Sequence, residues 1–166
     1  MQEITDATEA LKQAFRRHAS GVCLITLNDP TGKPVGFTAT SVTSLGSTPA
    51  LATFNVARGA SSWPALRESK FVAISMLNQE SLELSKKMAA DHTKRFIEDD
   101  WYRENKHDLP IFKKLNAVLI CKVRQFVEVE SNAVFIVEIE SGLLAEELPS
   151  LLYHQRGYVI PGERLS

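Results

Sequence analysis

Two strand-length runs in the last third of the sequence, residues 117–129 and 134–144, constrain the fold more than any other feature. In each run apolar side chains recur at every second position, which is typical of strands with a buried face. The predicted inner face of the first run, interrupted by Gln125, is Leu119, Cys121, Val123, Val127 and Val129. In the second run Phe135, Val137 and Ile139 share one face, and Glu138 and Glu140 share the other.

Four shorter runs rich in β-branched and apolar residues predict further strands, at residues 22–27, 35–40, 51–56 and 71–77. The first two are separated by the turn sequence NDPTGK, which predicts a hairpin. The strands are mostly joined without crossover helices. This arrangement favours a mainly β fold, an antiparallel barrel with peripheral α-helices.

Three helices are expected outside the barrel. The first is amphipathic: the residues on its predicted apolar face are Ile4, Ala7, Leu11, Ala14 and Phe15. We expect Asp6 to cap it and Gly21 to end it. The second, at residues 63–69, has a proline in its first turn, and the third runs from a cap at Asn78 or Ser81 through Ala90. Residues 91–114 are polar and predict irregular structure.

Length and composition exclude several classes of protein. We expect the 166 residues to form a single domain, residues 1–166. A formal net charge of −1 gives no electrostatic argument for binding nucleic acid or an anionic membrane. Only two cysteines occur, Cys23 and Cys121, within predicted strands and too far apart for a zinc knuckle. Buried, inert thiols in a reducing compartment are therefore expected, and with no leader or spanning segment we expect a cytoplasmic protein.

The sequence offers no familiar catalytic motif. It lacks HExxH, GxSxG and a Walker lysine loop, and its four histidines are scattered, so no metal site and no catalytic side chain are predicted. Seven hydroxyl-bearing residues lie between positions 38 and 49. With Ser61 and Ser62, and with Arg58, Lys94 and Arg95 as cations, they suit a phosphate-bearing ligand. The alternative is that these hydroxyls only form turns.

Five stretches in order resemble the flavin reductase-like, FMN-binding split-barrel family. FRRHASGV at 15–22 resembles the end of the family's first helix and the turn that follows it. GFTATSVTSL at 36–45, followed by Pro49, is the most specific match, and LYHQRGY at 152–158 resembles the closing motif. The remaining matches are residues 61–63, 71–77, 95–96, 101, 109–110 and 117–121.

The resemblance implies an antiparallel split β-barrel that forms a homodimer, with FMN, or alternatively FAD, beside the subunit interface. It implies NAD(P)H as co-substrate and a separate monooxygenase that receives the reduced flavin. The implied cofactor-binding residues are Thr38, Ala39, Thr40, Ser41, Asn55, Ser61, Ser62, Trp63, Arg95 and Phe96. The implied nicotinamide-binding residues are His154, Tyr158 and Asn132. The redox chemistry would belong to the flavin, which agrees with the missing catalytic motif.

Two departures from the family pattern leave alternatives open. Many reductases of the family carry a GDH segment where this chain has Glu130, Ser131 and Asn132, and a neutral Asn132 cannot titrate. Gly46 and Thr48 replace a serine and a proline of the second motif. The alternatives are an FMN-binding electron carrier or flavin store without reductase turnover, and a barrel that has lost its cofactor. The preference for NADH or NADPH stays open.

Overall fold

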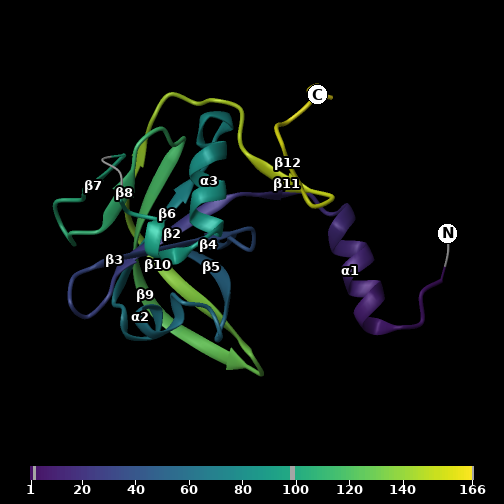
Figure 1. The fold of residues 1–166 in the computed structure, drawn as a ribbon, viewed down its shortest axis with the longest axis horizontal. Helices are drawn as coiled ribbons and strands as arrows, with labels where there is room; N and C mark the ends of the chain where they lie inside the picture. The colour runs from purple at the N-terminus through teal and green to yellow at the C-terminus, as the bar shows by residue number, and fades with distance from the viewer. Residues whose placement is uncertain (2, 98–99, 166) are drawn as a thin grey trace.

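The computed structural model describes residues 1, 3–97 and 100–165 and is built around one curved antiparallel sheet (Figure 1). The sheet has seven strands in the order β3-β2-β6-β9-β10-β5-β4. Their bounds are β2 Cys23–Asn28, β3 Pro34–Ala39, β4 Thr43–Ser47, β5 Ala50–Ala57, β6 Phe71–Met76, β9 Ala117–Val129 and β10 Asn132–Leu144. Every strand pair in it is antiparallel, as the sequence predicted.

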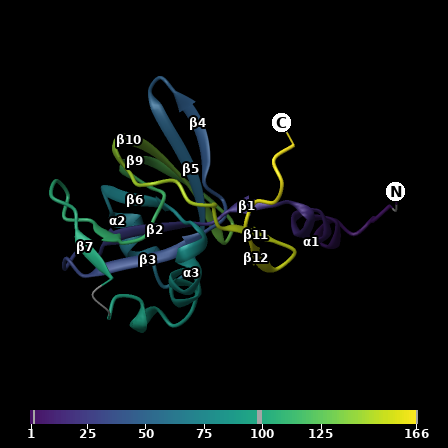
Figure 2. The same cartoon turned by 90° about the horizontal axis from the view of Figure 1, so that it is seen from above.

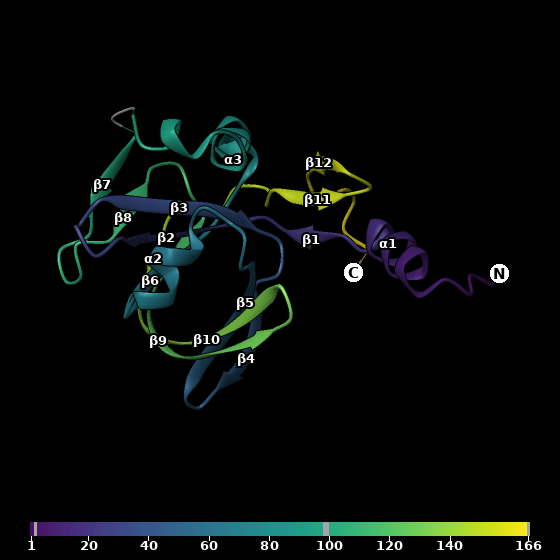
Figure 3. The same cartoon turned by 60° about the horizontal axis from the view of Figure 1, so that its bottom comes forward.

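The sheet curls into a barrel that stays split. β3 is one edge of the hydrogen-bonded order, and β4 with β5 forms the other end. The short helix α2 (Trp63–Glu68) lies across one end of the barrel, within the curve made by β9 and β10 (Figure 3). Its buried side chains, Trp63, Ala65 and Leu66, belong to the inner core. The predicted antiparallel split barrel is therefore confirmed.

Aromatic packing fills the barrel interior. Phe54 and Phe135 are fully buried, and their rings stack with centroids 5.2 Å apart. Cys23 and Cys121 lie in the same core, unpaired and buried. Burial raises the pKa of each thiol to about 12, because a thiolate loses its hydration there. The expectation of buried cysteines is confirmed, and their lack of reactivity stays a prediction.

A second layer covers the outer face of β3. Helix α3 (Leu82–Ala89) lies beside this strand (Figure 2), and Gly36 has no room for a side chain because a Cβ there would lie 2.7 Å from the Met88 methyl. The 3₁₀ turns η1 (Gln79–Ser81) and η2 (His92–Lys94) flank α3, with Asn78 as the cap of η1. The hairpin of β7 (Trp101–Arg103) and β8 (Pro110–Phe112) was not predicted.

A third unit projects from the barrel (Figures 1 and 3). Strand β1 (Ser20–Gly21) pairs with β11 (Leu152–His154), which pairs with β12 (Gly157–Val159). Helix α1 (Ala7–Arg17) precedes β1, and Asp6 caps it by accepting a hydrogen bond from the Glu9 backbone at 2.7 Å. None of its residues is buried. The expectation that Gly21 ends the helix was wrong: His18 caps it, and Gly21 is already paired in β1.

The predicted face of β9 is correct only as far as Val123. The register shifts there: Val123 pairs with Val137 and Gln125 pairs with Ile136, so that Arg124 is an extra residue in the ladder. After this bulge Phe126 packs into the core. Val127 and Val129 turn outward and are 50% and 56% exposed. A single extra residue therefore reverses the faces of the strand end.

The structure contains no helix long and apolar enough to span a membrane, within the residues that it describes. The other predicted strands and the second and third helices lie within one or two residues of their expected bounds. β4, β11 and β12 were not predicted as strands. In β4, all five residues are exposed.

Candidate functional site

A cleft of about 250 Å³ lies between the end of β3, the end of α3 and the β11–β12 hairpin. Its lining residues are Val22, Thr38, Thr40, Ala89, Tyr153 and Tyr158. The cleft therefore brings together two predicted cofactor residues, Thr38 and Thr40, and one predicted nicotinamide residue, Tyr158. These residues come from opposite ends of the sequence.

The alternation of β3 directs the two threonines into the cleft. Phe37 and Ala39 pack into the barrel core, so Thr38 between them faces outward. Thr40 continues this outer face beyond the end of the strand. The side chain of Ala39 is buried in the core, so only its backbone is available to a ligand.

Two tyrosines form the opposite wall of the cleft. Tyr153 and Tyr158 are cross-strand partners, and their rings meet edge to face with centroids 5.4 Å apart. Ser85 on α3 donates a hydrogen bond to the Tyr158 hydroxyl at 3.1 Å, which fixes the ring against α3. The cleft thus has aromatic groups on one wall and hydroxyl groups on the other, a combination that suits a flat, polar-edged ring.

Ser41 and Asn55 lie beside each other. The Asn55 backbone N–H donates to the Ser41 hydroxyl at 2.9 Å, which joins the segment after β3 to β5. The Asn55 side chain is exposed on the outer face of β5. The sequence placed both residues in the site, and the structure brings them together.

The loop after β5 holds Ser61, Ser62 and Trp63. Ser61 is exposed, whereas Ser62 is buried and its hydroxyl has no hydrogen-bond partner among the described residues. The Trp63 ring packs edge to face on Phe126 at 5.8 Å and Phe135 at 6.2 Å. Trp63 is therefore part of the barrel core.

Arg58 joins this loop to the β9–β10 turn. Its guanidinium forms an ion pair with Glu128 at 2.9 Å and donates to the Glu130 carbonyl at 2.9 Å. It also lies over the Trp63 ring, 5.8 Å from the centroid. Asn132 is the cross-strand partner of Ala57, so it lies beside this loop. The structure does not bring Asn132 to Tyr158 within one chain.

Arg95 and Phe96 brace β3 from outside. Arg95 donates to the Gly36 carbonyl at 2.7 Å and to the Ala90 carbonyl at 2.9 Å. Its Nε is buried without a partner among the described residues, and burial lowers the pKa of the guanidinium. Phe96 packs against Trp101, with ring centroids 5.6 Å apart. Both residues support the strand that carries Thr38.

His154 lies next to the cleft rather than in it. It lines an adjoining pocket between α1 and the β11–β12 hairpin, and Tyr153 lines both hollows. Tyr153 and the Ser85 hydroxyl were missed by the sequence reasoning. The tyrosine lies within the closing motif, next to the predicted His154, so the motif contained the signal.

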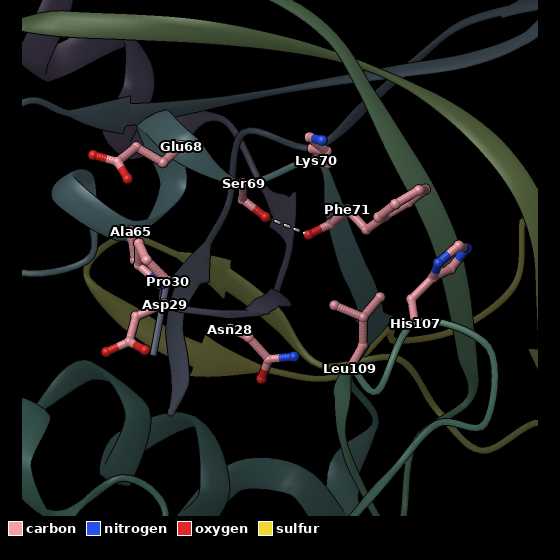
Figure 4. Close-up of a pocket in the computed structure, with 10 residues that line it drawn as sticks. All are labelled: Asn28, Asp29, Pro30, Ala65, Glu68, Ser69, Lys70, Phe71, His107 and Leu109. Carbon is pink, nitrogen blue, oxygen red and sulfur yellow. Dashed lines mark hydrogen bonds between the residues drawn. The ribbon is translucent and has the colours of Figure 1, made fainter. Parts of the chain in front are cut away.

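A different hollow lies at the other end of β2 (Figure 4). Val22, just before β2, lines the cleft, and Asn28 at the end of β2 lines this second pocket. The two sites are therefore separated by the length of the strand. Two of the polar side chains that line this second pocket already have backbone partners: Ser69 donates to the Phe71 carbonyl at 2.6 Å, and Asn28 donates to the Asp108 carbonyl at 3.0 Å. It contains none of the predicted site residues.

Within residues 1, 3–97 and 100–165, no cluster of three or more His, Cys, Asp or Glu side chains could hold a metal ion. The cleft itself offers hydroxyl donors, aromatic faces and backbone groups. Such groups can bind and orient a ligand, but none of them is an activated acid, base or nucleophile. The arrangement therefore suits the binding and orientation of a ligand.

Comparisons with known proteins agree with this geometry. The family model for the flavin reductase like domain matches residues 15–161. The chain is 31% identical over 152 residues to the stachydrine N-demethylase reductase subunit of Rhizobium meliloti, covering 92% of this chain and 65% of that protein. It is 31% identical over 155 residues to an NADH:FMN oxidoreductase of Rhodococcus erythropolis, covering 90% of this chain and 80% of that protein.

A crystal structure of a flavin reductase domain protein from Arthrobacter sp. FB24 superposes with a TM-score of 0.90 at 39% identity. The match covers 95% of this chain and 97% of that chain. Fold and sequence therefore lead to the same family.

Proposed function

Because the chain belongs to the flavin reductase like domain family, we propose that it is an NAD(P)H-dependent flavin reductase that uses FMN. The observation that carries the proposal is the cleft in which Thr38 and Thr40 face Tyr153 and Tyr158. A similar relative is named an NADH:FMN oxidoreductase, and that activity comes to this chain as part of the proposal.

The residues of the cleft fit a flavin ring. The ring is flat with polar edges, and the cleft offers two tyrosine rings, two threonine hydroxyls and the backbone of residues 38–41. Flavin bound there would supply the hydride-accepting chemistry. The protein's own part is to hold two rings in close contact and to keep water away from them.

The phosphate of FMN would lie at the loop after β5. Ser61 is exposed there, and the buried Ser62 hydroxyl lacks a partner. The Ser41–Asn55 contact joins this part of the molecule to the threonines of β3. Arg95 and Phe96 act on the site by holding β3 in place, and Trp63 acts by anchoring the loop in the core.

The nicotinamide would be bound by Tyr158, with His154 at the border of the cleft. Asn132 lies beside Ala57, at the other side of the phosphate loop. We propose that it reaches a nicotinamide only across a subunit interface. A neutral amide there donates a hydrogen bond and does not titrate.

A homodimer is supported by apolar surface that a monomer leaves exposed. Leu11 on α1 is 59% exposed, and Val127 and Val129 on β9 are 50% and 56% exposed. Clustered exposed apolar side chains mark interaction surfaces. We propose that a second copy covers these faces and that FMN lies near the interface.

The biological setting is proposed from the relatives. One of them, from Acinetobacter baylyi, is named the reductase component of a flavin-dependent trigonelline monooxygenase, so a separate monooxygenase is the proposed recipient of reduced flavin. Location in the cytoplasm and the treatment of residues 1–166 as one domain stay predictions. The two unpaired thiols agree with a reducing compartment.

The test measures oxidation of NADH and NADPH by the purified protein with added FMN, followed by the absorbance of the reduced nicotinamide. FMN binding is measured separately by quenching of flavin fluorescence. Turnover with either nucleotide supports the proposal. Binding of FMN without turnover would indicate a flavin carrier instead. No binding of FMN would overturn the assignment of the cleft.

A matched pair of variants locates the activity. Thr40→Val removes a hydroxyl from the cleft and should weaken FMN binding. Thr43→Val makes the same change on exposed β4, outside the cleft, and should not. Equal effects of the two changes would contradict the location of the site.

A further inference from the structure

A pocket of about 250 Å³ lies between α1 and the β11–β12 hairpin, next to the cleft. It is built from two parts of the chain that are distant in sequence. Its lining residues are Lys12, Phe15, Arg16, His18, Tyr153, His154, Gln155 and Arg156. Only His154 among them was a predicted site residue.

The charge of this pocket is one-sided. Lys12, Arg16 and Arg156 are cations at neutral pH, His18 and His154 add ring nitrogens, and no carboxylate lines the pocket. The salt bridges found among the described residues involve none of these five side chains. Uncompensated cations that surround one hollow favour an anionic ligand with several oxygen acceptors.

The two walls of the pocket are held together by the backbone. The Gln155 N–H donates to the Arg16 carbonyl at 3.0 Å, so the tip of the hairpin is attached to the last turn of α1. Gln155 and Arg156 have φ values of 48° and 66°, the left-handed conformation of a tight hairpin turn. Phe15 and His18 meet edge to face, with centroids 6.0 Å apart. The pocket is therefore a defined feature of the fold.

Tyr153 lines both this pocket and the cleft, so the two hollows adjoin each other. The cleft suits a flat ring, and the pocket beyond it suits phosphates. A nicotinamide dinucleotide has both parts, a flat ring at one end and phosphate groups farther along the same molecule. We infer that the pocket between α1 and β11–β12 binds phosphate groups of NAD(P)H, an inference that rests on the proposed function.

Two phosphate groups could account for the cations: the pyrophosphate present in both nucleotides, and the 2′-phosphate of NADPH. The variants Arg16→Gln and Arg156→Gln each remove one charge from the pocket. Arg17→Gln is the matched control, because Arg17 lies on the same helical turn, bonds to Gln13 and does not line the pocket. None of the three arginines is buried, so the variants should fold.

Each pocket variant should raise the KM for NADH about tenfold, the effect of losing one charge-assisted hydrogen bond, while kcat and the Kd for FMN stay unchanged. A reduced N-benzylnicotinamide carries no phosphate, and its oxidation should be the same in all variants. A rise in KM that is larger for NADPH than for NADH would assign the 2′-phosphate, and an equal rise would assign the pyrophosphate.

The inference is overturned if the pocket variants behave like Arg17→Gln, or if they slow the oxidation of the phosphate-free analogue equally. A direct titration separates this inference from the proposed function. ADP-ribose should bind the wild-type chain more tightly than either pocket variant, whether or not the protein turns over. Equal binding to all three would remove the pocket assignment even in an active reductase.

Discussion

The Asn55 backbone N–H donates a hydrogen bond to the Ser41 hydroxyl at 2.9 Å, and this bond joins the segment after β3 to β5. Ser41 lies two residues before Thr43 of β4, which pairs with Thr53 of β5, so the bond continues the β4–β5 pairing toward the end of β3. It lies between the threonines of the cleft and the serines of the loop after β5.

We expect Ser41→Ala to lower the free energy of unfolding by about 1 kcal/mol, the net worth of one hydrogen bond. It should also weaken FMN binding, because the two halves of the site would no longer be held in one geometry. Urea unfolding and flavin titration measure the two effects. Ser44→Ala on exposed β4 is the control. Unchanged FMN affinity in Ser41→Ala would contradict the bridging role.

The barrel could be predicted from the sequence because its central strands are buried and therefore rich in apolar residues. In β9, Cys121 packs in the barrel interior, whereas Val118 and Ile120 pack in the second core on the other face, so the run 117–121 is apolar throughout. Beyond Val123 the prediction failed. The bulge at Arg124 reverses the faces of the strand end, and in the sequence it is marked only by two consecutive polar residues, Arg124 and Gln125.

The strands that were missed bury little or have few residues. β4 is made of threonine, serine, leucine and glycine, all exposed, so its sequence resembles a loop. β11 and β12 have three residues each. Only half of the cleft was predicted. Thr38 and Thr40 were predicted because they belong to a specific motif. Tyr153 lies within the closing motif, but its position opposite Tyr158 depends on the pairing of two short strands, which the alternation of apolar residues did not predict.

Arg95 provides a second prediction. Both of its terminal nitrogens donate to backbone carbonyls, those of Gly36 and Ala90. We therefore expect Arg95→Ala to destabilise the protein by about 1–3 kcal/mol, the range for hydrogen bonds to a charged group, and to weaken FMN and riboflavin binding to the same extent. Thermal unfolding and two flavin titrations measure this. A loss confined to FMN would instead mean that Arg95 contacts the phosphate directly.

The two thiols should be unreactive in the folded protein. Burial raises the pKa of Cys23 and Cys121 to about 12, so almost no thiolate exists at pH 8. Ellman's reagent should label neither cysteine in buffer, and both after unfolding in guanidinium chloride. Alkylation with iodoacetamide should leave FMN binding unchanged. Rapid labelling of the native protein would show that the barrel core opens far more readily than its packing implies.

We expect the stability of the fold to depend on pH through Glu140. The Lys106 ammonium and the His107 ring both contact its carboxylate at 2.7 Å, and these hydrogen bonds lower the pKa of Glu140 below its ordinary 4.5. A lowered carboxyl pKa stabilises the folded protein at pH values above the ordinary pKa of 4.5. This stabilisation is lost as the pH falls through the pKa of the folded state.

We therefore expect Glu140→Gln to melt at a lower temperature than wild type at pH 7, and the difference to shrink as the pH falls below 4.5. Thermal unfolding between acid and neutral pH measures it. Glu146→Gln, at an exposed position, is the control and should show no such dependence. A difference that persists undiminished in acid would mean that the carboxylate stabilises the fold by packing alone.

The outer face of β9 tests the proposed dimer. The bulge at Arg124 turns Val127 and Val129 outward, and a charged side chain at either position should be tolerated in a monomer but not in a dry interface. We expect Val127→Lys to lower the mass measured by sedimentation from that of a dimer to that of a monomer, with little change in urea unfolding of the barrel itself. The same substitution at Leu45, 56% exposed on β4, is the control for an added charge at an exposed apolar position. If FMN lies near the interface, the monomeric variant should also bind FMN more weakly. If Val127→Lys stays dimeric, β9 is not part of the interface.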